Sequence, residues 1–224
     1  MATTGEPTST TTPSSDRFEL SDKPFLTPQR IRIFGIVAAI VAVAALATWF
    51  VITAGNRKEA FAASALDDAR NAAEQGNLPL AAQKFEQVST TYAGTAAAHE
   101  ASLGLVQVRL VGGQDELAIA TLDDLLKASP PAAYAAPANA LLGTAYENTG
   151  KFVEAAAAYR KAADQAITGY LKATYLLDAA RASRLAGKAD EAKTIYRDII
   201  ARFGETAART EAEVRLAEMN RGAL

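Results

Sequence analysis

Apolar residues recur at a fixed interval along most of the chain. Glycine returns every 37 residues, at Gly76, Gly113, Gly150 and Gly187. Alanine follows each glycine after five residues and a large apolar side chain after nine, which gives Ala81, Ala118, Ala155, Ala192, Phe85, Leu122, Tyr159 and Tyr196. A period of about 20–50 residues is typical of a solenoid, whose units bury their apolar faces only against their neighbours. The pattern therefore predicts stacked helical units, with any function on a surface that several repeats share.

The same spacing predicts about four helical hairpins and a terminal helix. Helices are expected at 57–75 and 84–92, at 96–128 with a break at Gly112-Gly113, in a third pair that Pro137 opens and that ends near 166, and at 170–203 with a break at Gly187. The last stretch, Glu205 to Met219, is predicted to cover the final apolar face, with Val214, Leu216 and Met219 turned inward.

An uncharged apolar segment precedes the repeats. It runs for 21 residues from Ile33 to Thr53, with Arg30 and Arg32 before it and Arg57 after it. A helix of this length spans roughly 30 Å, the thickness of a hydrocarbon core. A cleaved signal peptide has a shorter apolar core of about 7–15 residues, and a buried helix of this length is rare in a small chain. We expect a retained transmembrane helix at 31–55.

The residues around this segment suggest its orientation and the limits of the domains. Residues 1–30 are rich in Thr, Ser and Pro and lack the apolar side chains that offset ordering entropy, so we expect a disordered tail. Four positive residues precede the apolar segment and three follow it closely. This slight bias favours a cytoplasmic N-terminus in a single-pass inner-membrane protein, with the repeat domain of 56–224 periplasmic or otherwise extracytoplasmic.

The third unit resembles the tetratricopeptide repeat. It carries Leu142-Gly143, Tyr146, Gly150-Lys151-Phe152, Ala155 and Tyr159, in the order and spacing of that family. The second unit adds a closing Pro130, the fourth has Ala180 at the family's glycine position, and Asn139 replaces the family's tryptophan. The resemblance implies an all-α, tetratricopeptide-like solenoid whose first helices line a concave surface. It places a candidate partner-binding groove at Arg70, Gln107, Leu110, Thr144, Glu147, Arg181 and Arg184.

The composition of the chain limits the chemistry that its side chains can perform. The chain has no cysteine and only one histidine, His99, which leaves no thiol chemistry, cysteine zinc site or histidine metal cluster. Gly150-Lys151 is not part of a phosphate loop, because Ala145 stands where such a loop needs a glycine, five residues before, and Phe152 stands where it needs Ser or Thr. We expect no enzyme activity, no cofactor or metal and no small-molecule substrate. From Arg57 onward, 19 Lys and Arg face 21 Asp and Glu, which argues against nucleic acid.

The layout of a short leader, one span and a repeat domain resembles the bacterial ancillary subunit of the SecYEG translocon. That resemblance implies a membrane-tethered scaffold for protein export or envelope assembly, with translocon subunits or envelope chaperones as partners. Two alternatives stay open: a coordinator of cell-wall synthesis and division, and a structural accessory subunit held through its transmembrane helix. Arg181 and Arg184 share a helix face, so an acidic peptide could dock there. They are otherwise ordinary solubilising arginines.

Overall fold

The structure, a computed structural model, describes residues 28–222, and their side chains from residue 32 onward. That part of the chain is all-helical. The helices are α1 (Pro28–Glu74), α2 (Leu78–Thr91), α3 (Ala96–Val111), α4 (Asp115–Lys127), α5 (Ala132–Asn148), α6 (Phe152–Gln165), α7 (Gly169–Leu185), α8 (Ala189–Arg202) and α9 (Ala207–Asn220). The predicted fold class, a tetratricopeptide-like solenoid of helical hairpins, is confirmed.

The chain divides into two compact units between Val51 and Ile52. Before that boundary α1 leaves its apolar side chains open: Ile40 is 63% exposed and Trp49 is 64% exposed. Its most apolar window has a mean hydropathy of 2.5, and the helix is long enough to cross a membrane, a test that a signal sequence also passes. The predicted helix at 31–55 lies within α1, which begins at Pro28. Residues 1–27 of the predicted tail lie outside the described residues.

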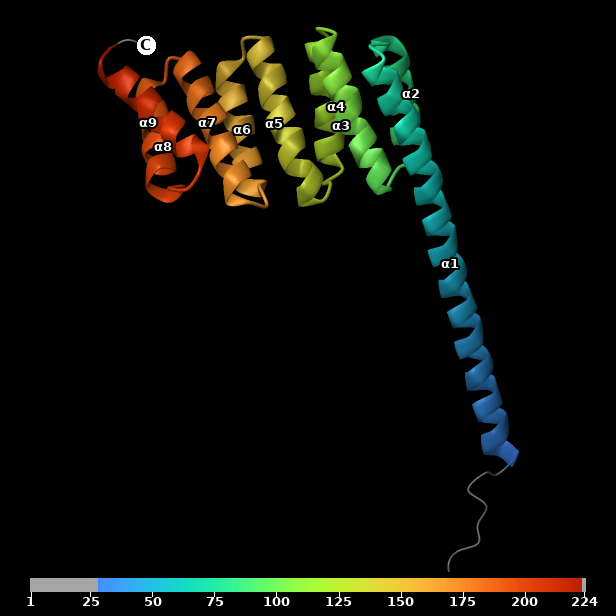
Figure 1. Ribbon diagram of the computed structural model, residues 1–224. Helices are drawn as coiled ribbons and strands as arrows, with labels where there is room; N and C mark the ends of the chain where they lie inside the picture. The colour runs from blue at the N-terminus through green and yellow to red at the C-terminus, as the bar shows by residue number, and fades with distance from the viewer. Residues whose placement is uncertain (1–27, 223–224) are drawn as a thin grey trace, which may run out of the picture. The chain divides into compact units, whose positions relative to one another are not determined.

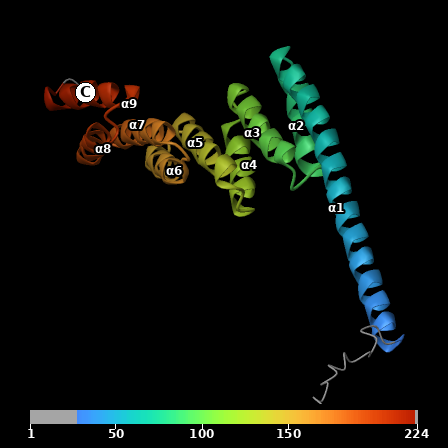
Figure 2. The same cartoon turned by 60° about the horizontal axis from the view of Figure 1, so that its bottom comes forward.

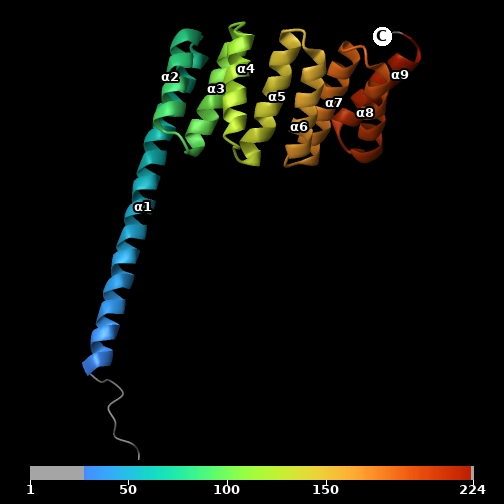
Figure 3. The ribbon, with the colours of Figure 1, turned by 180° about the vertical axis from the view of Figure 1, so that it is seen from behind.

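The repeat unit, from Ile52 onward, stacks the rest of α1 with α2, then α3 with α4, α5 with α6 and α7 with α8, and ends on α9 (Figure 1). Figure 2 shows α3, α5, α7 and α9 along one side of this unit and α4, α6 and α8 along the other. We call the side of the odd-numbered helices, including the repeat-unit part of α1, the first-helix face. The same succession of helices is seen from behind in Figure 3.

Each hairpin turns on a glycine in the left-handed region. The φ angles are 76° at Gly76, 69° at Gly113, 73° at Gly150 and 76° at Gly187, where a Cβ would be strained. At the third turn, the Gly150 N–H donates to Glu147 O at 3.0 Å and the next N–H donates to Tyr146 O at 2.8 Å. The same pair of bonds closes the other three turns, so each first helix ends in a Schellman motif. The 37-residue glycine period is therefore the period of the turns.

The alanine and large apolar positions of the repeat form the core. The alanines at 81, 118, 155 and 192 are all 0% exposed, which lets the helices approach closely. The large side chains nine residues after each glycine are at most 4% exposed. In the third unit a glycine adds to this close approach, since a Cβ at Gly143 would lie 2.7 Å from the Tyr159 ring. The Leu-Gly step of that unit thus leaves room for the tyrosine.

Two details differ from the sequence prediction. Pro137 lies inside α5, because the helix begins earlier, at Ala132, after the Pro131 cap. The Pro131 carbonyl accepts from the Ala135 N–H at 3.0 Å, and one proline near a helix start removes a single further bond.

Val214 is 50% exposed, whereas Leu216 packs against the core and Met219 is buried. Ala208 and Ala212 are the other buried residues of α9, so its inner face is turned away from Val214.

Candidate partner-binding groove

A polar network on the first-helix face joins α5, α6 and α7. Glu147 accepts from Arg181 through both oxygens, with Nε at 3.3 Å and Nη2 at 2.9 Å. The Tyr159 hydroxyl donates to Glu147 at 3.2 Å and lies 3.1 Å from Thr144 Oγ1. Asp178 adds a second carboxylate, 3.1 Å from Arg181 Nη2. The fold thus brings together Thr144, Glu147 and Arg181, which the family resemblance had selected from three separate positions.

Burial and charge act in opposite directions within this network. The pKa of Asp178 is raised, because the effect of burial is larger than the opposing effect of the Arg181 charge. Burial lowers the pKa of Arg181, but the two carboxylates outweigh that effect and raise it. Burial raises the pKa of Tyr159 to about 12. Arg181 is therefore held as a cation between two carboxylates of its own chain, and it does not offer an unpaired charge to a ligand.

A polar pocket of about 290 Å³ opens beside this network. It lies between α7, α8 and the terminal helix α9, and is lined by Thr174, Leu177, Asp178, Arg181, Arg184, Tyr196, Glu211 and Arg215. Arg184 is predicted for the groove from sequence, and the structure places it here with Arg181. Its Nε is buried and has no hydrogen-bond partner among the described residues. Burial raises the pKa of Tyr196, and Arg184 and Arg215 lower it.

A second, more apolar pocket of about 340 Å³ lies at the other end of the first-helix face. Arg70 and Gln107 line it together with apolar side chains of α1, α2 and α3. Gly104 leaves room for the Phe85 ring there, because a Cβ at Gly104 would lie 2.7 Å from that ring. Arg70 is paired with Glu100 and, at 3.4 Å, with Asp67. Leu110, the remaining predicted groove residue, is half-buried and packs against the core.

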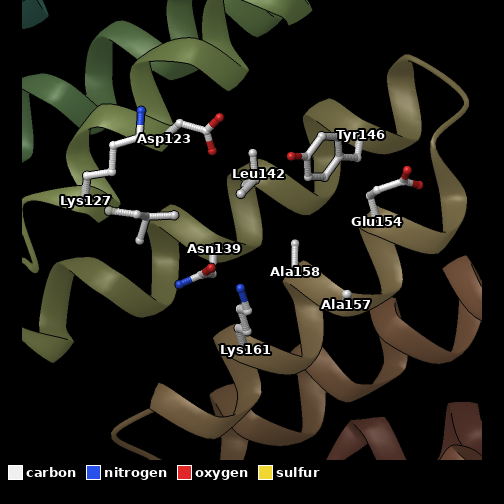
Figure 4. Close-up of a pocket in the computed structure, with 10 residues that line it drawn as sticks. Asp123, Lys127, Asn139, Leu142, Tyr146, Glu154, Ala157, Ala158 and Lys161 are labelled. Carbon is white, nitrogen blue, oxygen red and sulfur yellow. The ribbon is translucent and has the colours of Figure 1, made fainter.

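A further pocket, of about 440 Å³, lies between α4, α5 and α6 and contains none of the predicted groove residues. Figure 4 shows Asn139 and Lys161 at one end of it, with Leu142 and Tyr146 at the other. Asn139 is already satisfied, since its amide donates to Ala135 O and to Gln165 Oε1, each at 2.9 Å. Within residues 28–222, no group of His, Asp and Glu side chains is arranged to hold a metal ion.

Sequence reasoning missed three of the charged residues that line the polar pocket, namely Asp178, Glu211 and Arg215. Asp178 stands three residues before Arg181, on the same helix face, so that spacing could have identified it. Glu211 and Arg215 are on α9, and they reach the pocket only because α9 packs beside α7 and α8. Spacing within one helix carries no information on such a contact between helices.

Comparison with known proteins agrees with this architecture. The tetratricopeptide repeat-like domain family matches residues 51–173, and the tetratricopeptide repeat family matches residues 175–206. No curated protein matches the chain.

Among solved structures, nearly identical TPR-like repeats from Podosopora anserina share 18% identity and a TM-score of 0.57, over 71% of this chain and 86% of that one. MamA from residue 41 onward, of Desulfovibrio magneticus RS-1, shares 20% identity and a TM-score of 0.51, over 62% of this chain and 74% of that one. At this identity the likeness concerns the fold alone. Because the first family match covers more than half of the residues, the chain belongs to the tetratricopeptide repeat-like domain family.

Proposed function

We propose that this protein is a membrane-tethered scaffold that docks protein partners on its first-helix face and assists protein export or envelope protein assembly. Tetratricopeptide repeats support an interaction role because they stack into an extended surface. The observation that carries the proposal is the pair of pockets on this face, one mainly apolar beside Arg70 and Gln107 and one polar beside Arg184. A partner segment that crosses several repeats would contact both.

The N-terminal part of α1 supports tethering. A helix of a soluble core would bury its apolar side chains, whereas Ile40, Trp49 and Phe50 are each more than 60% exposed. Exposed apolar surface of this extent is suited to lipid. We propose that α1 anchors the chain in a bacterial inner membrane, with the N-terminus in the cytoplasm and the repeats outside it.

Export or envelope assembly is the role favoured by the layout of one span followed by a repeat domain. Tethering raises the local concentration of the repeats near other membrane proteins, so contacts in the groove can be weak and exchange quickly. Translocon subunits and envelope chaperones are the partners that this proposal expects. A coordinator of cell-wall synthesis would use the same face with division proteins, and an accessory subunit would rely on the transmembrane helix instead.

Crosslinking in intact cells that carry a C-terminally tagged copy tests these alternatives. Recovery of translocon subunits or chaperones is expected, and recovery of division proteins or cytoplasmic proteins would contradict the export role. A matched chain in which residues 31–55 are replaced by an unrelated transmembrane helix should keep its partners. Loss of every partner from that chain, with normal membrane insertion, would show that the span and not the groove is the contact.

A further inference from the structure

The connection from α6 to α7 exposes three large apolar side chains. Ile167 is 69% exposed, Tyr170 62% and Leu171 37%. Residues 165–171 carry no charge, and the two charges that flank them, Asp164 and Lys172, cancel. In the described chain, the other loops that lead from one hairpin to the next expose no side chain of this kind. We call Ile167, Tyr170 and Leu171 the α6–α7 tip.

The local structure of the tip is a short, capped connection. Ala166 leaves α6 in an extended conformation, with φ −63° and ψ 130°. Thr168 Oγ1 accepts from the Leu171 N–H at 3.3 Å and so caps the N-terminus of α7. The apolar side chains therefore project from the fixed first turn of a helix and not from a long loop.

The tip lies at the end of the repeat unit where the chain enters it. Lys58 Nζ, on α1, donates to Ala93 O of the α2–α3 loop at 2.9 Å. The Glu59 carboxylate accepts from the first two N–H groups of α3, at 3.2 and 3.1 Å. Because successive helices run in opposite directions, the loops between hairpins share this end of the unit, and the glycine turns share the other (Figure 1).

The proposed membrane anchor ends at the same place. The uncharged segment closes at Thr53, five residues before Lys58, which is about 8 Å of helix. The glycine turns are one helix length farther on, roughly 25 Å for the 17 residues of α5. When α1 spans a bilayer, the loop end of the repeat unit is therefore the end next to lipid.

The charges of the two ends differ in the direction that a lipid surface requires. The first turns of α4, α6 and α8, next to the glycine turns, carry Asp115, Glu116, Glu154, Asp190 and Glu191. The first turns of α3, α5, α7 and α9, at the loop end, carry no acid. Membrane surfaces with anionic lipid repel acids. Apolar side chains at the glycine turns thus stand among acids, whereas those of the α6–α7 tip do not.

We propose that the α6–α7 tip inserts into the interface of the bilayer that holds the anchor, so that the repeat unit contacts lipid at a second point. Tyr170 suits this depth, because its ring is apolar and its hydroxyl can stay among the headgroups. The inference rests on the proposed anchor. Tethering keeps the tip at a high local concentration beside the bilayer, so a weak contact is sufficient. Two points of contact would fix the direction in which the first-helix face points.

The test measures which side chains touch lipid in the full chain. The chain has no cysteine, so single cysteines can be labelled with the fluorophore NBD. The protein is reconstituted in vesicles of phosphatidylcholine and phosphatidylglycerol, with and without doxyl-labelled lipid, which quenches NBD by contact. Ile167→Cys reports on the tip and Ile40→Cys on the anchor. Val153→Cys is the matched control at the glycine-turn end, since its side chain is also apolar and is 49% exposed.

The label at 167 should be quenched about twofold or more relative to the label at 153, which lies roughly one helix length farther from lipid. Tyr170→Ser should shift the equilibrium of the labelled tip away from lipid about tenfold, because it removes a large apolar side chain from the contact. Quenching at 167 should then fall toward that at 153. Leu117→Ser is the control, because it removes an apolar side chain that is 52% exposed at the glycine-turn end, and should change nothing.

Three results would overturn the proposal. The first is equal quenching at 167 and 153. The second is quenching at 167 that falls equally with Tyr170→Ser and Leu117→Ser. The third is a blue shift of the label at 167 without quenching by doxyl lipid, which would report a protein contact such as a second copy of the chain.

The label at 40 separates failure of this proposal from failure of the anchor. If doxyl lipid quenches the label at 40 but not the label at 167, the anchor stands and the contact of the tip is wrong. If it quenches neither label, both are wrong.

Discussion

Ser183 is a polar side chain whose burial destabilises the fold. It lies on α7 with 0% of its surface exposed, and its Oγ has no hydrogen-bond partner among the described residues. On folding, such a hydroxyl loses its hydrogen bonds to water and gains none from the protein. Ser183→Ala removes the unsatisfied atom and changes little else, so we predict that this substitution stabilises the protein.

The size of the effect follows from three contributions. Removing an unsatisfied hydroxyl recovers about 1–3 kcal/mol. Alanine adds roughly 0.5 kcal/mol of helix propensity over serine. The small void left by the oxygen costs about 1 kcal/mol. The free energy of unfolding should therefore rise by about 0.5–2.5 kcal/mol, which corresponds to roughly 1–10 °C in Tm for a domain of this size.

Urea unfolding of the full chain in detergent, followed by far-UV circular dichroism, measures the change. Ser102→Ala is the matched control, because Ser102 also lies within a first helix but its Oγ donates to Ala98 O at 3.0 Å. That control should gain no stability or lose a little. A lower urea midpoint for Ser183→Ala than for wild type, at an unchanged m-value, would refute the reasoning.

The remaining predictions concern the turns, a helix cap and a buried tyrosine. Gly150→Ala should lower the free energy of unfolding by about 1–2 kcal/mol in urea, because φ is 73° there. Lys188→Asn should raise it by about 1 kcal/mol in the same assay, since Lys188 has nearly the backbone angles of Asn77, whose side chain caps α2, and makes no cap bond itself. Tyr159 has a pKa of about 12 in the folded state, against 10.0 for an unperturbed tyrosine. Between pH 10 and 12 the unfolded chain therefore loses the Tyr159 proton while the folded chain keeps it, so the free energy of unfolding falls as the pH rises. Wild type should lose up to about 1.4 kcal/mol more per pH unit than Tyr159→Phe in that window, and parallel pH profiles would contradict this.

Features set by local geometry could be predicted from the sequence. The glycine of each turn is required by its φ angle, and the alanine five residues later by the close approach of two helices. Both constraints act on one residue at a time and recur in each repeat, so glycine and alanine reappear in the sequence at a fixed spacing. The uncharged stretch of α1 is equally local, since its length and its apolar composition can be read directly from the sequence.

Features set by contacts between helices could not be predicted. Arg181 seemed available to a ligand because Glu147, its partner, lies 34 residues away on another helix. The exposure of Val214 depends on which face of α9 packs against α7 and α8. That face carries the small residues Ala208 and Ala212, and the apolar character of Val214 does not by itself place Val214 on it. Pro137 was misplaced because the start of α5 is set by the cap at Pro131 and not by the second proline.

Site-specific photocrosslinking tests most directly whether partners dock on the first-helix face. A photoreactive amino acid would replace Gln107 or Glu211, which are exposed in the two pockets of that face, and in matched chains Gln83 or Arg197, which are exposed on α2 and α8. Crosslinks to the same partner from Gln107 and Glu211, and none from Gln83 or Arg197, are the predicted result. Equal crosslinking from Gln83 and Arg197, or none from either pocket position while a partner still co-purifies, would contradict the account.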